Sequence, residues 1–180
     1  MTSKKKLLLL GSALILLTSF VTWQSKKGNK EDGEIQWVSF EEAVRLNEKN
    51  PRKIFIDLYT NWCGWCKRMD ATTFRDSSIV HYMNEKFYAV KFNAETRDTI
   101  TFRGKKFLYN SQYRVNEFAL SLMSGKIAGY PTSIYMDEKY NILTTISSYL
   151  KPDQLNPVLK YFGENTYQKT SWEEFQKSQQ

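Results

Sequence analysis

Hydrophobic positions divide the chain into an apolar leader, a short polar segment and a long region with alternating strand and helix patterns. In the leader, three lysines at positions 4–6 precede an uncharged, leucine-rich stretch of 17 residues over 7–23. A helix of that length spans roughly 26 Å, between a signal-peptide core and a membrane span. Residues 1–23 are therefore predicted to be an export signal peptide or a signal anchor in the membrane. The pattern of small residues that a signal peptidase requires is poor here, which favours the uncleaved anchor. Residues 24–34 are polar and of mixed charge, which is typical of a tether.

The patterns after residue 34 predict an α/β domain. The run over 54–59 is apolar except for Asp57, a pattern typical of a strand that is covered on both faces. Further strands are predicted over 87–92, 133–136 and 142–146. Helices are predicted after Ser39 and Asp76, from about Cys63, from Pro152 and from Ser171, with SxxE capping boxes at both serines. This order indicates a domain over 35–163 and a helical extension over 164–180.

The segment 96–126 is longer and less regular than the rest of the predicted domain. Two short β-prone runs flank residues 103–105, which predicts a hairpin over 100–109. An amphipathic helix is predicted to begin at Val115 and to end at Gly125. We interpret the segment as an insertion that could cover a site or select a partner.

The composition fits one folded domain and excludes several classes of protein. The 180 residues are 41% hydrophobic and 15% aromatic, which is enough for a core and argues against a disordered or disulfide-stapled chain. Two cysteines and one histidine exclude a four-ligand structural zinc site within the chain, and we expect no metal and no cofactor. The net charge of +7 includes the three leader lysines, and the rest is spread out. A nucleic-acid partner is therefore not expected.

The candidate chemistry lies in the sequence WCGWCK, which follows a buried strand and opens a predicted helix. Cysteines three residues apart in a helix share a face, with Cα atoms roughly 5–6 Å apart, so they can form a disulfide. Backbone N–H groups and the helix dipole stabilise a thiolate at such a position. Cys63 is therefore the predicted nucleophile, and Cys66 the cysteine that resolves the mixed disulfide. A static structural disulfide and a metal site are the alternatives.

Asp57 interrupts an apolar strand six residues before Cys63. A buried carboxylate is costly and needs a purpose or a partner. We expect Asp57 to accept the proton of Cys66, with its pKa raised by burial, unless it serves only as a structural hydrogen-bond acceptor. Lys91, on the neighbouring predicted strand, is the candidate ion partner.

The remaining polar and aromatic side chains near the motif are interpreted more simply. Trp62 and Trp65 are expected to form an apolar collar for a docking peptide, with core packing as the alternative. Lys67 is interpreted as a solvated lysine, although it could lower the pKa of the thiol. His81 is expected to be a surface or core histidine rather than a ligand or a base.

The chain resembles the thioredoxin superfamily from about Trp37 to Phe162. The resemblance rests on FIDLYTNWCGWCK, AVKFNAE and IAGYPTSIYMDEKYNI, in which a strand aspartate, a CxxC pair and GYPT occur in the order and spacing of that family. It implies a thioredoxin-like α/β fold with a central mixed β-sheet flanked by helices, and an insertion before the strand that follows the cis-proline. Within the superfamily, the continuation CKRMDATTFRDSSIV is similar to exported bacterial thioredoxin-like proteins.

The resemblance also implies roles for individual residues. Pro131 would be a cis-proline facing the cysteine pair rather than an ordinary turn residue, and Tyr130 would offer backbone groups to an extended substrate. Asp57 would be the buried acid and Lys91 its neighbour. The candidate substrate-binding residues are those around the two motifs: Trp62, Gly64, Trp65, Tyr130, Pro131 and Thr132. The chain departs from the family in the Gly64–Trp65 pair between the cysteines, and in Ser148, where many thioredoxins have a groove glycine.

The expected function is that of a thiol–disulfide oxidoreductase for disulfides of exported proteins, acting as a reductant. A membrane electron-donor or redox partner protein would then be needed to reduce the pair again. The expected location is the periplasmic side of the inner membrane if the leader is retained, and otherwise periplasmic or secreted. The alternatives are a non-catalytic binding module, and an oxidase or isomerase that runs the same chemistry in the other direction.

Overall fold

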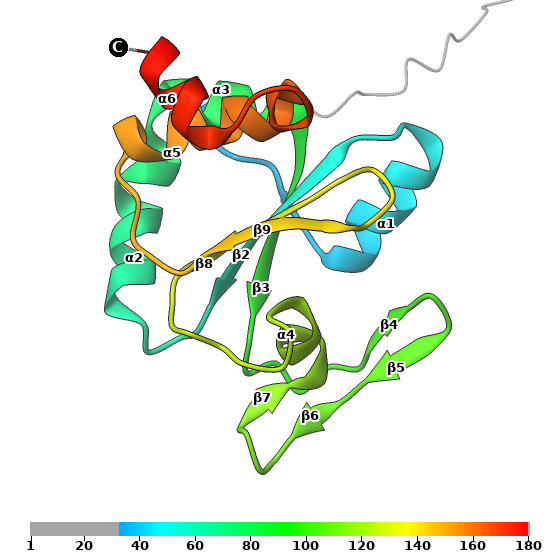
Figure 1. Ribbon diagram of the computed structural model, residues 1–180. Helices are drawn as coiled ribbons and strands as arrows, with labels where there is room; N and C mark the ends of the chain where they lie inside the picture. Colours follow the sequence, from blue (N-terminus) through cyan, green and yellow to red (C-terminus); the bar gives the residue numbers. More distant parts are fainter. Residues whose placement is uncertain (1–32, 180) are drawn as a thin grey trace, which may run out of the picture. The chain divides into compact units, whose positions relative to one another are not determined.

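A five-stranded mixed sheet organises residues 33–179, the part of the chain that the computed structural model describes (Figure 1). The strand order is β1-β3-β2-β8-β9. The first three strands in this order are parallel, whereas β8 runs antiparallel to both β2 and β9. The strands are β1 (Trp37–Val38), β2 (Lys53–Tyr59), β3 (Phe87–Asn93), β8 (Thr132–Met136) and β9 (Ile142–Ile146). The predicted mixed sheet is confirmed, although β1 was not predicted because two residues give no periodic signal.

Helices cover both faces of the sheet (Figure 1). One face carries α1 (Phe40–Lys49) and α4 (Glu117–Leu122). The other carries α2 (Gly64–Ala71), α3 (Ser77–Lys86), α5 (Pro152–Gly163) and α6 (Trp172–Ser178), together with the short 3₁₀ helices η1 (Thr73–Arg75) and η2 (Thr166–Gln168). The predicted helices after Ser39, Asp76, Pro152 and Ser171, and the one near Cys63, are therefore confirmed.

The central strand β2 divides its side chains between two hydrophobic cores. Ile54, Ile56 and Leu58 belong to the core under α1 and α4. Phe55 belongs to the core under α2, α3 and α5. Because alternate residues of a strand share a face, the side chain of Asp57 lies on the same face as Phe55, the face that α2 covers. The strand is thus buried on both sides, as its apolar pattern predicts.

The insertion lies beyond the end of the sheet at which β3 finishes (Figure 1). It contains the hairpin β4 (Ile100–Phe102) and β5 (Lys105–Phe107), the small pair β6 (Tyr109–Asn110) and β7 (Val115–Asn116), and α4. The predicted hairpin is confirmed. Its two turn residues, Arg103 and Gly104, have φ angles of 51° and 76°, which is the backbone of a tight hairpin turn.

Two sequence-based predictions about helix starts need correction. The helix of the insertion begins at Glu117 rather than Val115, because the side-chain oxygen of Asn116 accepts the N–H of Phe118 at 2.9 Å and caps the helix there. Val115 pairs instead with Asn110 in the small sheet. At α1 only half of the capping box forms: Ser39 caps the helix, whereas the Glu42 carboxylate pairs with Arg45.

The predicted leader and most of the predicted tether lie within residues 1–32, outside the described residues. Among residues 33–179 no helix has the length and apolar character needed to cross a bilayer. At the other end, Ser171 is the N-cap of α6 and forms with Glu174 the full capping box that the sequence predicts.

Candidate active site

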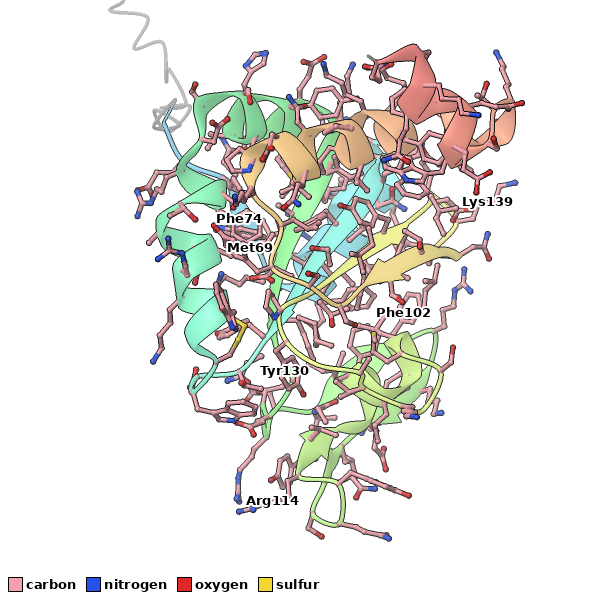
Figure 2. The ribbon with its side chains drawn as sticks, turned by 60° about the vertical axis from the view of Figure 1, so that its left-hand side comes forward. Met69, Phe74, Phe102, Arg114, Tyr130 and Lys139 are labelled. Carbon is pink, nitrogen blue, oxygen red and sulfur yellow. A yellow bond between two sulfur atoms is a disulfide. The ribbon has the colours of Figure 1, made fainter. Side chains whose placement is uncertain are left out.

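The cysteine pair forms a disulfide at the start of α2 (Figure 2). The two Cα atoms are 5.3 Å apart, within the range expected for cysteines on one helix face. Cys63 is the N-cap of the helix, and its Sγ accepts the backbone N–H of Cys66 at 3.0 Å. The first turn of α2 contains no acidic residue that would oppose negative charge on this sulfur. The local structure therefore has the features that stabilise a thiolate at position 63.

The surroundings of the disulfide are exposed although its sulfurs are not. Cys63 is 4% exposed and Cys66 2% exposed, so the two cysteines are almost equally buried in the disulfide form. Trp62 and Trp65, in contrast, are 67% and 59% exposed, which rules out the alternative that they are core residues. A Cβ atom at Gly64 would meet nothing within 4 Å, so the space beside Cys63 is open. Lys67 is solvated, as predicted.

An ionic cluster around the buried Asp57 joins β2, β3 and α2. The ammonium group of Lys91 contacts Asp57 Oδ2 at 3.0 Å and also contacts Asp70, which lies one helical turn after Cys66. The same ammonium lies over the rings of Trp37, at 5.0 Å, and Tyr59, at 5.2 Å. The predicted pairing of Asp57 with Lys91 is confirmed, and Asp70 is a further partner.

Burial raises the pKa of Asp57 to about 6, because a fully covered carboxylate loses the hydration of its charged form. The positive charge of Lys91 offsets part of this effect, and the negative charge of Asp70 adds to it. Burial alone would lower the pKa of Lys91, but the charge of Asp57 and hydrogen bonds to both aspartates raise it. The Oδ1 atom of Asp57 has no hydrogen-bond partner within the described chain. Asp57 is thus a carboxyl group that can change protonation near neutral pH.

The peptide bond between Tyr130 and Pro131 is cis, as the resemblance implies. The Tyr130 ring packs edge-on against Trp62, with ring centroids 5.8 Å apart, which brings this turn beside the cysteine motif (Figure 2). Burial, with a smaller effect of the Glu95 charge, raises the pKa of the Tyr130 hydroxyl to about 12. Thr132 is fully buried, and its hydroxyl donates to the Gly129 carbonyl at 2.7 Å, so its side chain braces the turn.

On the other side of the motif, Trp65 packs on Tyr149 with ring centroids 5.4 Å apart. Together with Tyr130 and the exposed Ser148 they line a shallow groove of about 340 Å³. Ser148 therefore lies at this surface, where the resemblance places a groove glycine. His81 lies elsewhere, exposed on α3 with Glu85 at 3.7 Å, as expected of a surface histidine.

Sequence reasoning missed three residues around the site. Asp70 was assigned no role from the sequence, yet it is the second carboxylate partner of Lys91. Glu95 accepts the indole N–H of Trp62 at 2.9 Å and holds that ring in place. Asn116 links the insertion to the end of β3, because its backbone N–H donates to the Ala94 carbonyl at 2.7 Å. Only Asp70 gave a usable signal, since it follows Cys66 by four residues and therefore shares its helix face.

Comparisons with known proteins agree with this geometry. The family Thioredox_DsbH, described as "Protein of unknown function, DUF255", matches residues 27–174. The thiol:disulfide interchange protein DsbD of Yersinia pestis (strain Pestoides F) is 22% identical over 146 residues, covering 77% of this chain and 21% of that protein. The uncharacterized protein B0495.5 of Caenorhabditis elegans is 23% identical over 128 residues, covering 71% and 16%. This chain therefore spans about a fifth or less of the length of these curated relatives.

Two solved structures share the fold. One is described as "DsbH Oxidoreductase", with a TM-score of 0.54 and 14% identity, covering 78% of this chain and 94% of that one. The other is a putative disulphide-isomerase from Bacteroides thetaiotaomicron, with a TM-score of 0.51 and 26% identity, covering 74% and 96%. The chain thus belongs to the Thioredox_DsbH family, has the thioredoxin fold, and carries at Cys63 and Cys66 the CxxC pair of a thiol–disulfide oxidoreductase.

Proposed function

We propose that this chain reduces disulfides of exported polypeptides, with Cys63 as the nucleophile and Cys66 as the resolving cysteine. The observation that carries the proposal is the position of the Cys63 sulfur, which caps α2 and accepts the N–H of Cys66 at 3.0 Å. A backbone donor and a helix N-terminus both favour the thiolate over the thiol. The open space at Gly64, the next residue, leaves room for a substrate chain beside Cys63.

In the first step the Cys63 thiolate attacks one sulfur of a substrate disulfide. The substrate S–S bond breaks, a mixed disulfide forms between Cys63 and the substrate, and the other substrate sulfur leaves as a thiolate that takes up a proton. Trp62 and Trp65 flank the attacked bond and hold the substrate chain through apolar contact.

In the second step Cys66 loses its proton and attacks Cys63 Sγ. The substrate's second sulfur leaves as a thiolate, and the Cys63–Cys66 disulfide forms, so two electrons have passed to the substrate. Asp57 accepts the Cys66 proton through the carboxylate oxygen that Lys91 does not bind. A pKa of about 6 leaves Asp57 mostly ionised at neutral pH, in the form that can accept a proton.

The oxidised pair has to be reduced again by another dithiol. We place this chain outside the cytoplasm, tethered by an apolar segment over 7–23 that follows the lysines at 4–6, and supplied with electrons by a membrane protein. The printed name of the relative DsbD, a thiol:disulfide interchange protein, supports exchange with protein thiols. Both the membrane anchor over 7–23 and the membrane electron donor are inferred from the sequence.

The proposal is tested by trapping. In Cys66→Ser, the mixed disulfide on Cys63 cannot be resolved, so partner polypeptides are expected to remain attached and to be released by a reductant on a gel. The matched variant Cys63→Ser should trap none, because its remaining cysteine is not the N-cap of α2, the position at which a thiolate is stabilised. If Cys66→Ser also traps nothing, the chain is a binding module with a resting disulfide.

The direction of electron flow is tested by the reduction potential of the pair. A reductant is expected to have a potential below about −200 mV, toward that of thioredoxin. A value near −120 mV would make the chain an oxidase instead.

A further inference from the structure

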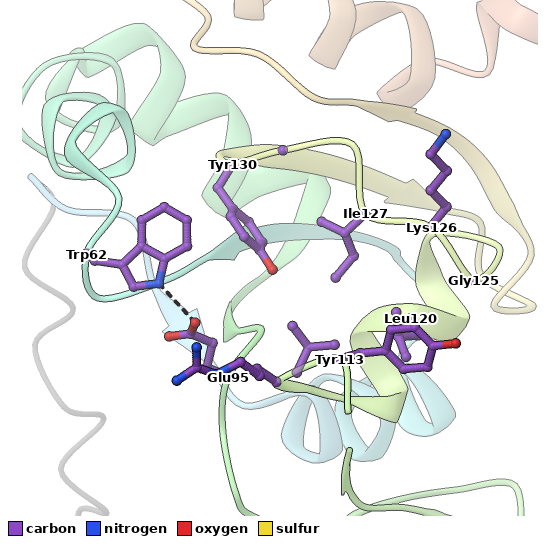
Figure 3. Close-up of a pocket in the computed structure, with 11 residues that line it drawn as sticks. Trp62, Glu95, Tyr113, Leu120, Gly125, Lys126, Ile127 and Tyr130 are labelled. Atoms are coloured by element: carbon purple, nitrogen blue, oxygen red, sulfur yellow. Dashed lines mark hydrogen bonds between the residues drawn. The ribbon is translucent and has the colours of Figure 1, made fainter. Parts of the chain in front are cut away.

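A pocket of about 630 Å³ lies between the cysteine motif and the insertion (Figure 3). Trp62 and Tyr130 form the wall next to the disulfide. The opposite wall comes from the insertion and the chain that leaves it: Tyr113, Val115, Leu120 and Ile127. We call this cavity the insertion pocket. Its wall at Trp62 adjoins the proposed site of disulfide exchange, because Trp62 directly precedes Cys63 in the chain.

Hydrogen bonds and ring contacts fix the wall beside the disulfide. The Trp62 indole N–H donates to Glu95 at 2.9 Å, and its ring packs against Tyr130 at 5.8 Å between centroids (Figure 3). Because both contacts hold the indole, Trp62 keeps its position although it is largely exposed. The pocket therefore has a preformed aromatic wall.

The insertion is also anchored, so the opposite wall is not a loose flap. Phe118 of α4 packs against Phe40 of α1 at 4.4 Å and against Phe107 of the hairpin at 5.3 Å between centroids. Buried Asn116 donates its side-chain amide to the carbonyl of Asp98 at 2.9 Å. The contact with Phe40 joins the insertion to the main hydrophobic core, and the other two hold the insertion together. A ligand would therefore meet a pocket that already exists.

The lining indicates what kind of group the pocket accepts. Its walls are mainly aromatic and aliphatic, which favours a large apolar side chain. Two cationic side chains, Arg114 and Lys126, are exposed and line the same pocket. Among the lining residues of the described chain the acidic one is Glu95, whose carboxylate is engaged by Trp62. The pocket thus combines an apolar interior with a net positive lining.

We propose that the insertion pocket binds the segment of a substrate polypeptide next to its reactive cysteine, taking a bulky apolar side chain, with an acidic neighbour near Arg114 and Lys126. This inference rests on the proposed function, and names the substrate class for the same cysteines. An extended chain advances about 3.3 Å per residue, so a residue two or three positions from the substrate cysteine reaches past Trp62 into the pocket. The insertion selects substrates, and the cysteine pair reduces them.

The test compares two synthetic peptides, each carrying one cysteine as a mixed disulfide with mercaptoethanol. One peptide has Phe and Glu near the cysteine, and the other has Ser and Gln at those positions. The reduced protein is mixed with each peptide and with hydroxyethyl disulfide, a small substrate without side chains. Oxidation of Cys63 and Cys66 is followed by alkylation and mass spectrometry. Each peptide rate is divided by the same protein's rate with hydroxyethyl disulfide, so that a difference between variants in the fraction of folded protein does not affect the comparison.

With the wild-type protein, the ratio of the normalised rate for the Phe/Glu peptide to that for the Ser/Gln peptide is expected to be about ten. This is the order of discrimination that an apolar pocket provides. Tyr113→Ala should bring this ratio below about threefold, because it removes one aromatic wall. The matched control is Leu108→Ala, another exposed apolar residue of the insertion, which lies outside the pocket lining and should leave the ratio unchanged.

The charge contribution is tested separately. Lys126→Glu is expected to reduce the preference several-fold and to weaken its dependence on salt. Lys106→Glu makes the same change of charge on the hairpin, away from the pocket, and should leave the preference intact.

Equal normalised rates for both peptides in the wild type would overturn the inference, as would an unchanged preference in both Tyr113→Ala and Lys126→Glu. A concentration-dependent dimer that Tyr113→Ala dissociates would overturn it too, by assigning the pocket to a second copy of the chain. If the reduced wild type failed to react even with hydroxyethyl disulfide, the proposed function itself would fall, a result distinguishable from the loss of peptide preference.

Discussion

Two buried charged side chains lie on the same face of β2, four residues apart, and they differ in how fully they are paired. Lys53, at the beginning of the strand, is 3% exposed and binds Glu138 at 2.8 Å and Asn165 at 2.7 Å. Asp57, near its end, is 1% exposed and has one oxygen on Lys91 and the other without a partner in the described chain. A buried charge with two partners ties structural elements together, whereas a half-paired carboxylate with a raised pKa can exchange a proton.

The largest expected effect concerns how stability depends on pH. The pKa of Asp57 is raised in the folded protein to about 6, from 3.8, so its contribution to stability is fully present below pH 4 and is lost as the pH rises through 6. Relative to Asp57→Asn, the oxidised wild type should therefore lose about 3 kcal/mol of unfolding free energy between pH 3 and pH 7. Denaturant unfolding of both proteins at several pH values measures this difference. A constant difference would show that Asp57 is not neutralised in that range.

The second prediction concerns activity at the same residue. Asp57→Asn should slow the resolving step by about 100-fold at pH 7, because Cys66 then loses its proton without a base. The defect should shrink at higher pH, where water and hydroxide deprotonate the thiol. Stopped-flow measurement of mixed-disulfide decay tests both statements. A defect that is the same at every pH would indicate a structural role.

At the other end of the strand, Lys53→Met is expected to lower the unfolding free energy by about 2 kcal/mol, since it leaves Asn165 and Glu138 without their shared donor. The cost is moderate because Glu138 is partly exposed and can be hydrated. The disulfide-reducing activity of the Lys53→Met variant, per folded molecule, should equal that of the wild type. Loss of activity without loss of stability would show that Lys53, like Asp57, acts in the reaction and does not have a purely structural role.

The smallest effect is expected at Asp70. Its negative charge raises the pKa of Asp57, so Asp70→Asn should lower the midpoint of the pH profile of the resolving step, by less than about one pH unit. Glu48→Gln, which removes a charge from an exposed position on α1, serves as the control and should leave the midpoint in place. An upward shift in Asp70→Asn would contradict the assigned arrangement of charges.

The features of the site that the sequence predicted are those marked by a short local pattern. An aspartate inside an apolar run, cysteines at a helix start and a proline in GYPT each stand out within a few residues. The partners of Lys53 are 85 and 112 residues away, and neither appears in a local pattern. Lys91 could be paired with Asp57 because neighbouring strands place them opposite each other, which the register confirms.

The insertion shows why the rest could not be predicted. Asn116 continues an amphipathic pattern, yet it caps α4 and binds carbonyls 18 and 20 residues earlier, so the helix starts later than its periodicity indicates. The insertion pocket likewise depends on Trp62, Tyr113 and Tyr130, which only the tertiary fold brings together. Periodicity identifies elements, but long-range contacts decide where they end and which cavities they enclose.

The most direct measurement is the pH dependence of Cys63 alkylation by iodoacetamide in the reduced protein, with the modified cysteine identified by mass spectrometry. The account predicts that Cys63 reacts first, with a midpoint below about pH 7.5, because the start of α2 stabilises its thiolate. A midpoint at or above about 8.5, the value of an ordinary cysteine, or faster labelling of Cys66, would contradict it.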